Sequence, residues 1–430
     1  MTRAMRSETL FGPLDPFENR NTADVTFKGK LGLPIHRWYR LTPSFSPHLA
    51  LDIAEHFALT SSDYVLDPFS GVGTVPLCMK YEGIPSCSIE LNPYLHFVST
   101  VKTRSYPDLT QIVRYFEDFT RLAREETTGL LDEGRARDYL REHARYVPPI
   151  HKPERWWSPI NLSQLVAIRK LMLNHADTGH HIDLLRMGIL GILVPASNAK
   201  HNHVSLTFAD EPLPPMDVTE ALCRKLDDIL EDLQGASHRS SAGVTVYAGN
   251  SRDVAGVLPE HPRVSAVITS PPYPNRFSYA RETRPHLFFF DFISSAKAVG
   301  LLETDAIGGT WGKATSVLSG GVEPMNDMVR DLLAPYTAKI NGSGKLMASY
   351  VTKYFNNMYE HAEGIAKVCQ HHAQLAYVIG NSKFYGHPLP SDELLARIFC
   401  HFGFTLSGIS KMRRRQSKSG LYEAVVFMEQ

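Results

Sequence analysis

The chain of 430 residues is too long for one small domain, so we expect two or three structural units or one large domain with insertions. Its composition is that of a soluble globular protein, and it lacks both a run of about 18 apolar residues and a signal-peptide core, which excludes a membrane protein and favours the cytoplasm. Lys and Arg balance Asp and Glu at 45 each, which argues mildly against a dedicated nucleic-acid binder, and five scattered cysteines without a C-x-x-C pair indicate neither disulfides nor a metal site.

The first hundred residues predict a polar arm over 1–30 and then one βαβ unit. The expected elements after the arm are a helix over 47–59, a buried strand over 64–69, a glycine turn over 70–74, a helix over 74–82 and a second strand over 86–90. A strand, turn, helix and strand in this order imply a parallel sheet. We therefore assign residues 31–104 to the first half of an α/β domain.

Residues 105–240 follow a different pattern. They are rich in Arg, Glu, Leu and Asp at helical spacing, with short Pro-rich breaks, and predict a helical insertion. The α/β pattern resumes over 241–430, the second half of the domain. Strands are expected there at 245–249, 264–269, 346–351, 375–379, 404–410 and 422–428, and the last two should form a hairpin at the edge of the sheet.

The glycine turn after the first strand is the first group of residues that predicts chemistry. Gly71 and Gly73, two residues apart, let the backbone turn tightly and approach a ligand. The sequence is neither the G-x-G-x-x-G dinucleotide motif nor a P-loop. Glu90 closes the second strand, where a carboxylate can accept both hydroxyls of a ribose. A glycine turn together with this acid predicts a nucleoside cofactor without a pyrophosphate.

The second group of residues is Thr269-Ser-Pro-Pro-Tyr273, which ends a β-run. Two prolines fix the backbone and remove two N–H donors, so the carbonyls before them are expected to point outward at the carboxyl end of a parallel strand. Such acceptors suit an amino group, and Tyr273 offers a flat face for a base taken out of its stack. Taken alone, the same residues fit a rigid surface turn equally well.

Together these two segments resemble motifs of the amino-methyltransferases that act on DNA bases, F-x-G-x-G and [DNS]-P-P-[YFW]. Ile89–Asn92 resembles the family's acidic motif, Tyr247–Asp253 its adenine-contacting motif and Leu41–Pro47 its N-terminal motif. Asn250 stands where the family usually has Asp, and Ser46-Pro47 where it usually has Lys-Pro. The long insertion between the second and third motifs also departs from the common motif orders.

The resemblance implies a Rossmann-like class I methyltransferase sheet, mostly parallel with its last strand antiparallel, and S-adenosylmethionine as cofactor. Residues 31–104 would then be the cofactor-binding half, residues 241–430 the target-base half, and the insertion a region that could recognise DNA. The cofactor-binding residues that it implies are Phe45, Asp67, Pro68, Phe69, Gly71, Gly73, Thr74, Glu90, Leu91, Asn250 and Ser251, and the catalytic residues are Ser270, Pro271, Pro272 and Tyr273.

Serine at the first position of the catalytic motif resembles the cytosine-N4 enzymes, whereas Asp or Asn more often marks adenine N6. A serine cannot act as a general base at neutral pH, so catalysis would rest on positioning and electrostatics. Adenine-N6 methylation of DNA, N-methylation of an RNA base, and a methyltransferase-like subunit without activity remain alternatives. The intact motif residues argue against the inactive subunit.

The expected partner is duplex DNA with a flipped base, and a cognate restriction endonuclease fits the same role. Phosphate contacts are expected from cations that follow the catalytic turn and from a basic cluster in the loop of the last hairpin. The candidates are Arg276, Arg281, Lys411, Arg413, Arg414, Arg415 and Lys418. Candidate readers of the DNA sequence are 200–203, the insertion and 306–322, and nothing indicates the oligomeric state.

Overall fold

The structure is a computed structural model, and it describes residues 15–44, 46–174, 179–201, 206–236, 241–258, 263–310, 313–415 and 419–430. Phe45, a predicted cofactor contact, and Lys418, a member of the predicted basic cluster, lie outside the described residues.

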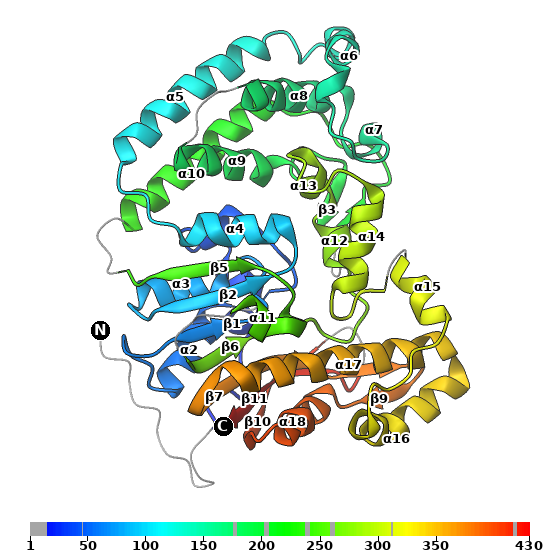
Figure 1. Cartoon of the computed structure of the whole chain (residues 1–430). Helices are drawn as coiled ribbons and strands as arrows, with labels where there is room; N and C mark the ends of the chain where they lie inside the picture. Colours follow the sequence, from blue (N-terminus) through cyan, green and yellow to red (C-terminus); the bar gives the residue numbers. More distant parts are fainter. Residues whose placement is uncertain are drawn as a thin grey trace.

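Seven strands form one twisted sheet at the centre of the molecule (Figure 1). They are β1 (Val65–Asp67), β2 (Ser86–Glu90), β5 (Val244–Ala248), β6 (Val264–Thr269), β7 (Cys369–Gly380), β10 (Thr405–Arg414) and β11 (Tyr422–Glu429). Their order is β10-β11-β7-β6-β1-β2-β5, and β11 runs antiparallel to both of its neighbours. All other pairings are parallel. The expected class I methyltransferase sheet is confirmed.

Alternate residues along the central strands face two different cores. On one side, Ala376 and Val378 of β7 pack with α2 (Pro47–His56) and α3 (Thr74–Tyr81). On the other side, Leu375 and Tyr377 pack with α17 (Lys345–Val368) and α18 (Ser391–His401). A strand buried on both faces reads as a continuous apolar run, which is why the sequence revealed these strands.

The predicted strand over 346–351 is wrong, because these residues begin helix α17. Its buried side chains Met347, Tyr350, Val351, Tyr354 and Met358 recur every three or four residues, which is the period of a helix face. A short apolar run alone does not distinguish a strand from a buried helix. The helical period becomes visible only over the longer segment.

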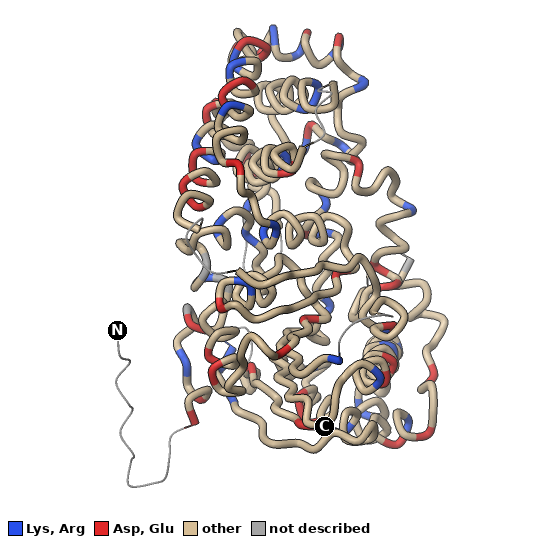
Figure 2. The backbone as a smooth tube through the Cα atoms, turned by 60° about the vertical axis from the view of Figure 1, so that its left-hand side comes forward, with Lys and Arg blue, Asp and Glu red and all other residues tan. Residues whose placement is uncertain are grey.

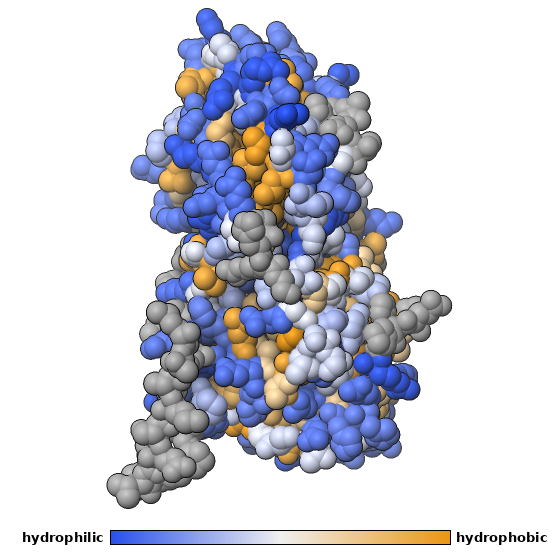
Figure 3. Space-filling model, turned by 90° about the vertical axis from the view of Figure 1, so that its left-hand side faces the viewer, coloured by the Kyte–Doolittle hydropathy of each residue, from blue (hydrophilic) through white to orange (hydrophobic). Residues whose placement is uncertain are grey.

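The described residues between 105 and 240 are mostly helical and lie beyond α4 (Pro93–Thr103) in Figure 1. Their elements are α5 (Leu109–Glu126), α6 (Glu133–Glu142), η3 (Ala144–Tyr146), α7 (Pro153–Trp156), α8 (Pro159–Asn174), α9 (His180–Ile192), α10 (Val218–Ala236) and a small hairpin of β3 (Ala199–His201) and β4 (Leu206–Phe208). Basic and acidic residues are interspersed over this region in Figure 2. Figure 3 shows that the upper part of the molecule has a largely hydrophilic surface with a strip of hydrophobic residues.

This helical region shares one hydrophobic core with the α/β domain. Phe119 and Leu190 belong to the same cluster as Tyr94 of α4 and Phe289. The buried carboxylate of Asp232 on α10 accepts hydrogen bonds from Ile35 N (2.7 Å) and from the Trp38 indole (2.9 Å). The helices therefore extend the fold that carries the sheet.

The catalytic motif is followed by α12 (Tyr279–Glu282), α13 (Arg284–Phe289), α14 (Ala296–Asp305), α15 (Lys313–Ser319) and α16 (Asp327–Ser343). The remaining elements are α1 (Thr22–Val25), η1 (Phe27–Lys30), η2 (His36–Trp38), η4 (Ser251–Asp253), α11 (Val254–Val257), and the hairpin β8 (Ser382–Phe384) with β9 (His387–Leu389). No helix of the described residues is both long and apolar enough to span a membrane.

The described part of the predicted arm, residues 15–30, packs on the sheet. The ring of Phe17 lies 5.0 Å from that of Phe427 on β11, and Arg20 donates its backbone N–H to the carbonyl of Met412 on β10 (2.8 Å). Asp15 accepts a hydrogen bond from Ser410 of the same strand. These contacts hold α1 and η1 beside the carboxyl end of β10.

Candidate active site

The two glycines of the turn after β1 have different tasks. Both have positive φ, +52° at Gly71 and +74° at Gly73, which side chains rarely adopt. A Cβ on Gly71 would meet no clash, because its nearest neighbour, Leu41 Cδ2, lies at an ordinary contact distance of 3.8 Å. A Cβ on Gly73 would lie 2.6 Å from Ser99 Oγ of α4. Gly71 thus faces a ligand space, and Gly73 allows α3 to approach α4 closely.

Glu90, at the end of β2, fastens the turn to the neighbouring strand. Its carboxylate accepts from the backbone N–H groups of Gly71 (2.7 Å) and Asn92 (2.8 Å). Burial raises the pKa of Glu90 to about 7, against these two hydrogen bonds, which lower it. An ionised carboxylate has about four acceptor positions, so two remain for a ligand.

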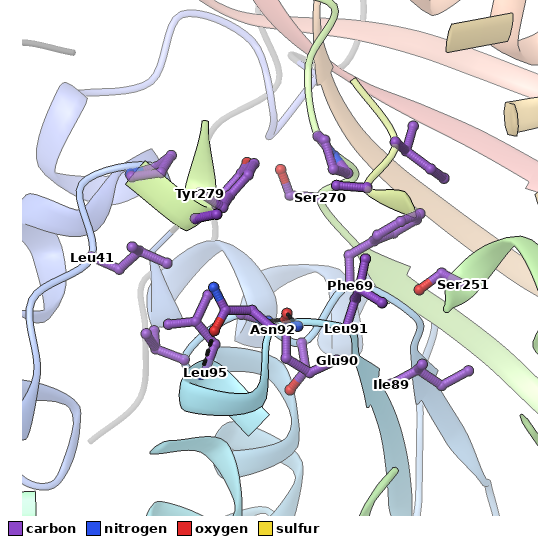
Figure 4. A pocket seen from close by; sticks show the side chains of 18 of the residues that line it. Leu41, Phe69, Ile89, Glu90, Leu91, Asn92, Leu95, Ser251, Ser270 and Tyr279 are labelled. Atoms are coloured by element: carbon purple, nitrogen blue, oxygen red, sulfur yellow. Dashed lines mark hydrogen bonds between the residues drawn. The ribbon is translucent and has the colours of Figure 1, made fainter. Parts of the chain in front are cut away.

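A hollow lies next to this turn. Its empty volume is about 970 Å³, which includes the space at its opening to solvent. Figure 4 shows Ser270 and Tyr279 at one end of it and Glu90 at the other. Most of the predicted cofactor-binding residues line it, namely Pro68, Phe69, Gly71, Thr74, Glu90, Leu91, Asn250 and Ser251. Leu41, Pro43 and Ser44 of the N-terminal motif line it as well. The sequence motifs therefore converge on one space.

Asp67, a predicted cofactor contact, does not line this hollow. The side chain is 2% exposed and accepts from Thr269 Oγ1 (2.7 Å) and from the backbone N–H of Phe69 (3.1 Å). Burial raises its pKa to about 7. Gly73 is also absent from the lining, for the packing reason given above. Asp67 and Gly73 therefore support the turn from the protein interior.

Asn250 and Ser251 follow β5 and already have protein partners. Asn250 Oδ1 accepts from the backbone N–H of Arg252 (3.1 Å), and its Nδ2 donates to the carbonyl of Asp305 (3.1 Å). The Ser251 hydroxyl donates to the carbonyl of Pro68. Asn250 therefore caps η4 and ties it to the end of α14, and a cofactor contact would use the remaining acceptor position of its oxygen.

A second hollow, of about 850 Å³ counted in the same way, adjoins the first at Ser270. Pro271 and Tyr273 line only this one, together with residues of α1, η1, β10 and β11. The residues common to both hollows are Pro43, Ser44, Ser270, Phe277 and Tyr279. The first residue of the predicted catalytic motif thus stands between the predicted cofactor space and a second ligand space.

The hydroxyl of Ser270 donates its hydrogen to the carbonyl of Val378 on β7 (3.1 Å). A hydroxyl has one donor and two acceptor lone pairs, so this bond leaves acceptor positions. The carbonyl of Pro272, in contrast, is occupied by the hydroxyl of Tyr354 on α17 (2.8 Å). Ser270 and Pro271, the other two residues at the start of the motif, both line the second hollow.

The ring of Tyr273 packs at the end of β7. A Cβ on Gly380 would lie 3.0 Å from this ring and 3.1 Å from the guanidinium carbon of Arg415, so any larger residue there would press on both groups. Arg415 lies 5.8 Å from the ring centre and donates to the carbonyl of Asn381. Burial, followed by the charge of Glu423, raises the pKa of Tyr273, which keeps its hydroxyl neutral.

The basic cluster lies mostly in strand β10 and not in the loop where we expected it. Lys411, Arg413 and Arg414 belong to β10, and Arg415 follows directly. Arg413 forms a two-pronged ion pair with Glu423 of β11, with Nε–Oε2 at 2.7 Å and Nη2–Oε1 at 2.9 Å. Arg415 points inward, whereas Lys411 and Arg414 are exposed. The strand continues farther than expected because Arg413 and Arg414 pair with β11.

The cations after the catalytic turn remain at the surface. Arg276 is exposed, with φ +64°, and donates its backbone N–H to the hydroxyl of Tyr350 (3.1 Å). Arg281 is exposed on α12. Tyr279 of the same segment lines both hollows. His286 and Phe288, farther along the chain, are buried.

Sequence reasoning missed one wall of the first hollow. It consists of Phe277, Tyr279, Ala280, Leu302, Glu303, Ala306, Ile307 and Gly309, from α12, α14 and the segments beside them. Among them Glu303 is 5% exposed and accepts from the Ser278 hydroxyl. The only signal was that 277–280 directly follows the catalytic turn, because 302–309 reads as an ordinary helix and loop.

No group of side chains that could hold a metal ion occurs among the described residues.

The chain is similar to curated methyltransferases over most of its length. It is 23% identical to the Type II methyltransferase M.BsoBI of Geobacillus stearothermophilus, over 94% of this chain and 85% of that protein. It is also 23% identical to the Type II methyltransferase M.AvaI of a Nostoc species and of Anabaena variabilis, over 60% of this chain and 54% of each relative. No family model matches the chain.

The match to M.BsoBI spans both halves of the sheet and the helical region between them, and the two motifs meet in one site. The chain is an S-adenosylmethionine-dependent methyltransferase. Among solved structures, TrmN from Thermus thermophilus (11% identity, TM-score 0.29, 91% of this chain and 49% of that chain) and the rRNA methyltransferase aviRa from Streptomyces viridochromogenes (10%, 0.29, 90% and 86%) are similar to it. Likeness of this size indicates nothing further.

The first hollow of this methyltransferase fits the cofactor. Gly71 leaves the space that a Cβ would fill, Glu90 has acceptor positions suited to a ribose diol, and Phe69, Leu91 and Leu95 supply apolar walls. When bound, S-adenosylmethionine supplies an electrophilic methyl group. The acceptor positions of Ser270 lie at the other end of the same hollow.

Proposed function

We propose that this methyltransferase modifies N4 of cytosine in DNA, within one specific sequence. The observation that carries the proposal is the position of Ser270, which lines both hollows and keeps only acceptor positions for a ligand. An exocyclic amino group in the second hollow would find its hydrogen-bond acceptor at the opening toward the methyl donor. The names of the Type II relatives support a DNA substrate.

The residues act on the target nitrogen by positioning it. The lone pair of an aromatic amino group is conjugated with the ring and is poorly nucleophilic. Hydrogen bonds from its two hydrogens to Ser270 Oγ and to the carbonyl of Ser270 or Pro271 favour a pyramidal nitrogen whose lone pair points toward the first hollow. Ser270 takes no proton, because a serine hydroxyl is no base at neutral pH. The proton leaves the nitrogen for solvent once the N–CH₃ bond has formed, when the nitrogen is strongly acidic.

In this proposal the target base is flipped out of the duplex, because a base that is stacked inside the helix cannot enter the second hollow. Tyr273 offers the stacking face, and its hydroxyl stays neutral because its pKa is raised. Phosphate contacts come from the exposed cations Arg276, Arg281, Lys411 and Arg414. A cognate restriction endonuclease would recognise the same sequence.

We further propose that residues 105–240 recognise the DNA sequence through the part nearest the catalytic turn. The hairpin β3–β4 is joined to α12 by a hydrogen bond from Leu206 N to Glu282 Oε2 (2.8 Å). Exposed Arg155 stacks on Phe208 of this hairpin, 4.2 Å from the ring centre, and exposed Lys200 lies on β3. These cations are held next to the segment that carries Arg281.

Single-molecule sequencing of DNA from a methylase-free bacterial host that produces the protein tests this function. We expect N4-methylcytosine in one short sequence and no modification with Ser270→Ala, which removes the acceptor. Mass spectrometry of nucleosides from the same cells identifies the base independently. N6-methyladenine in DNA would overturn the choice of base, and a methylated base found only in RNA would overturn the DNA substrate.

A further inference from the structure

The ion pair of Arg413 and Glu423 lines the second hollow with the catalytic motif. Both residues line the same space as Ser270 and Tyr273, and Thr22, Val25, Thr26 and Lys28 of the N-terminal segment line it as well. The charge of Glu423 raises the pKa of Tyr273 and that of Arg413 lowers it. The pair is therefore close to the stacking face that we propose for the target base.

The pair is bidentate and keeps donors for a ligand. Glu423 is 8% exposed and takes the Nε–H and one Nη2–H of Arg413 in a two-pronged bond. A guanidinium has five N–H donors in a fixed plane, so the Nη1 donors and the second Nη2 donor remain. Because β10 and β11 pair directly at these two positions, the strand pairing sets the direction of the fork.

A flipped base presents its Watson–Crick edge to its pocket. Cytosine shows one donor there, the N4 amino group, and two adjacent acceptors, N3 and O2. Adenine shows its N6 amino group and only N1 as acceptor, next to a C–H. Uracil and thymine show an N3–H donor, which would oppose the donors of a guanidinium. A fork that only donates matches cytosine best.

We propose that Arg413, held in place by Glu423, donates hydrogen bonds to N3 and O2 of the flipped cytosine while Ser270 accepts from N4. Arg413 is then a reader of the base and not a phosphate contact. The inference rests on the proposed function, and it assigns the choice of cytosine over adenine to the β10–β11 hairpin in addition to Ser270.

The test uses duplexes that contain the sequence identified in the host, with either cytosine or adenine at the target position. We compare kcat/KM for the two bases between the wild-type protein and Arg413→Lys, which keeps the charge and an ion pair but loses the fork. A bidentate base contact is worth about 1–3 kcal/mol of discrimination, so the preference for cytosine should fall about 5- to 150-fold. Glu423→Gln, which loosens the fork, should lower the preference less.

Arg414→Gln is the matched control, because Arg414 is the next residue on the same strand and is exposed. It should alter the salt dependence of DNA binding and leave the preference for cytosine unchanged. Calorimetry with S-adenosylmethionine checks that each variant is folded. An unchanged preference in a folded Arg413→Lys protein overturns the inference. Failure of the wild-type protein to methylate cytosine N4 would instead contradict the proposed function, so the two failures are distinguishable.

Discussion

Thr269 donates its hydroxyl to the carboxylate of Asp67 at 2.7 Å, and this buried bond joins the ends of β6 and β1. Asp67 precedes the glycine turn and Thr269 precedes Ser270. This hydrogen bond extends the pairing of β1 with β6 to the point where the turn that faces the cofactor space and the turn that carries the catalytic motif begin. Neither residue lines the cofactor hollow.

Thr269→Val, which keeps the shape and removes the hydroxyl, should lower the free energy of unfolding by about 1–3 kcal/mol, because it leaves a buried acceptor without this partner. Urea unfolding followed by circular dichroism measures the loss. Thr269→Ser retains the hydroxyl and should lose less. Equal stability of the valine variant and the wild type would show that the bond does not hold the two turns.

Gly71→Val should abolish binding of S-adenosylmethionine while the fold survives. Its Cβ enters the ligand space, and the positive φ costs about 1–2 kcal/mol of stability. Gly73→Ala should instead destabilise the protein, by about 1–3 kcal/mol, because its Cβ collides with Ser99. Calorimetric titration and thermal unfolding of both variants separate the two effects. Wild-type affinity in Gly71→Val would remove this turn from the cofactor site.

Binding of S-adenosylmethionine should weaken as the pH falls below about 7. Two backbone N–H groups and two ribose hydroxyls need four acceptor positions, which Glu90 has only when ionised, and its pKa is raised to about 7. The dissociation constant should then rise about tenfold per pH unit in the acidic range. Calorimetric titrations from about pH 5.5 to about pH 8.5, a range of roughly one and a half units on either side of the pKa, measure this slope.

The raised pKa of Glu90 also affects the stability of the protein without cofactor. Because it lies above the ordinary value of 4.5, the contribution of Glu90 to stability is greatest below about pH 4.5 and is lost as the pH rises through 7. Glu90→Gln cannot titrate, so its cofactor affinity should be low and independent of pH. A Gln variant that keeps the wild-type pH profile would assign the titration to another group.

Tyr273→Ala should reduce methyl transfer far more than cofactor binding, because it removes a stacking face worth about 1–3 kcal/mol per base. Tyr273 lines only the second hollow, so the cofactor space stays intact. Tyr273→Phe keeps the ring and is the control. Single-turnover rates on duplex DNA and calorimetry with the cofactor measure the two effects. Transfer near the wild-type rate in the alanine variant would place the target base elsewhere.

Changing Lys411 and Arg414 together to Gln should reduce the log–log salt dependence of duplex binding by roughly two units, about 0.9 for each phosphate that the protein no longer neutralises. Only these members of the basic cluster are exposed among the described residues, since Arg413 is paired with Glu423 and Arg415 lies against Tyr273. Lys339→Gln on α16 is the control. Fluorescence anisotropy over a salt series measures the slope, and an unaltered slope would show that the two cations do not bind phosphate.

The sequence alone determined the elements whose signals are local. The strand ends follow from buried apolar runs closed by glycine, acid or proline. The structure ends β2 at Glu90 and β6 at Thr269, as expected, and ends β1 at Asp67, two residues before the expected end. The helical region was equally readable, because its long helices repeat their apolar residues at the helical period. The convergence of Phe69, Glu90 and Ser270 on one site follows from the edge that parallel strands share.

Only the tertiary structure decided how the polar residues are used. Asp67 and Gly73 belong to the predicted motif but hold the turn from beneath, because their partners Thr269 and Ser99 are far away in the sequence. Arg413 and Arg414 are adjacent residues of the same type. Strand pairing places Arg413 in an ion pair with Glu423 and leaves Arg414 exposed. The wall formed by 302–309 has no motif, since a residue lines a cavity through packing and not through its type. Contacts between residues that are far apart in the sequence decide these roles, and a local sequence pattern does not contain those contacts.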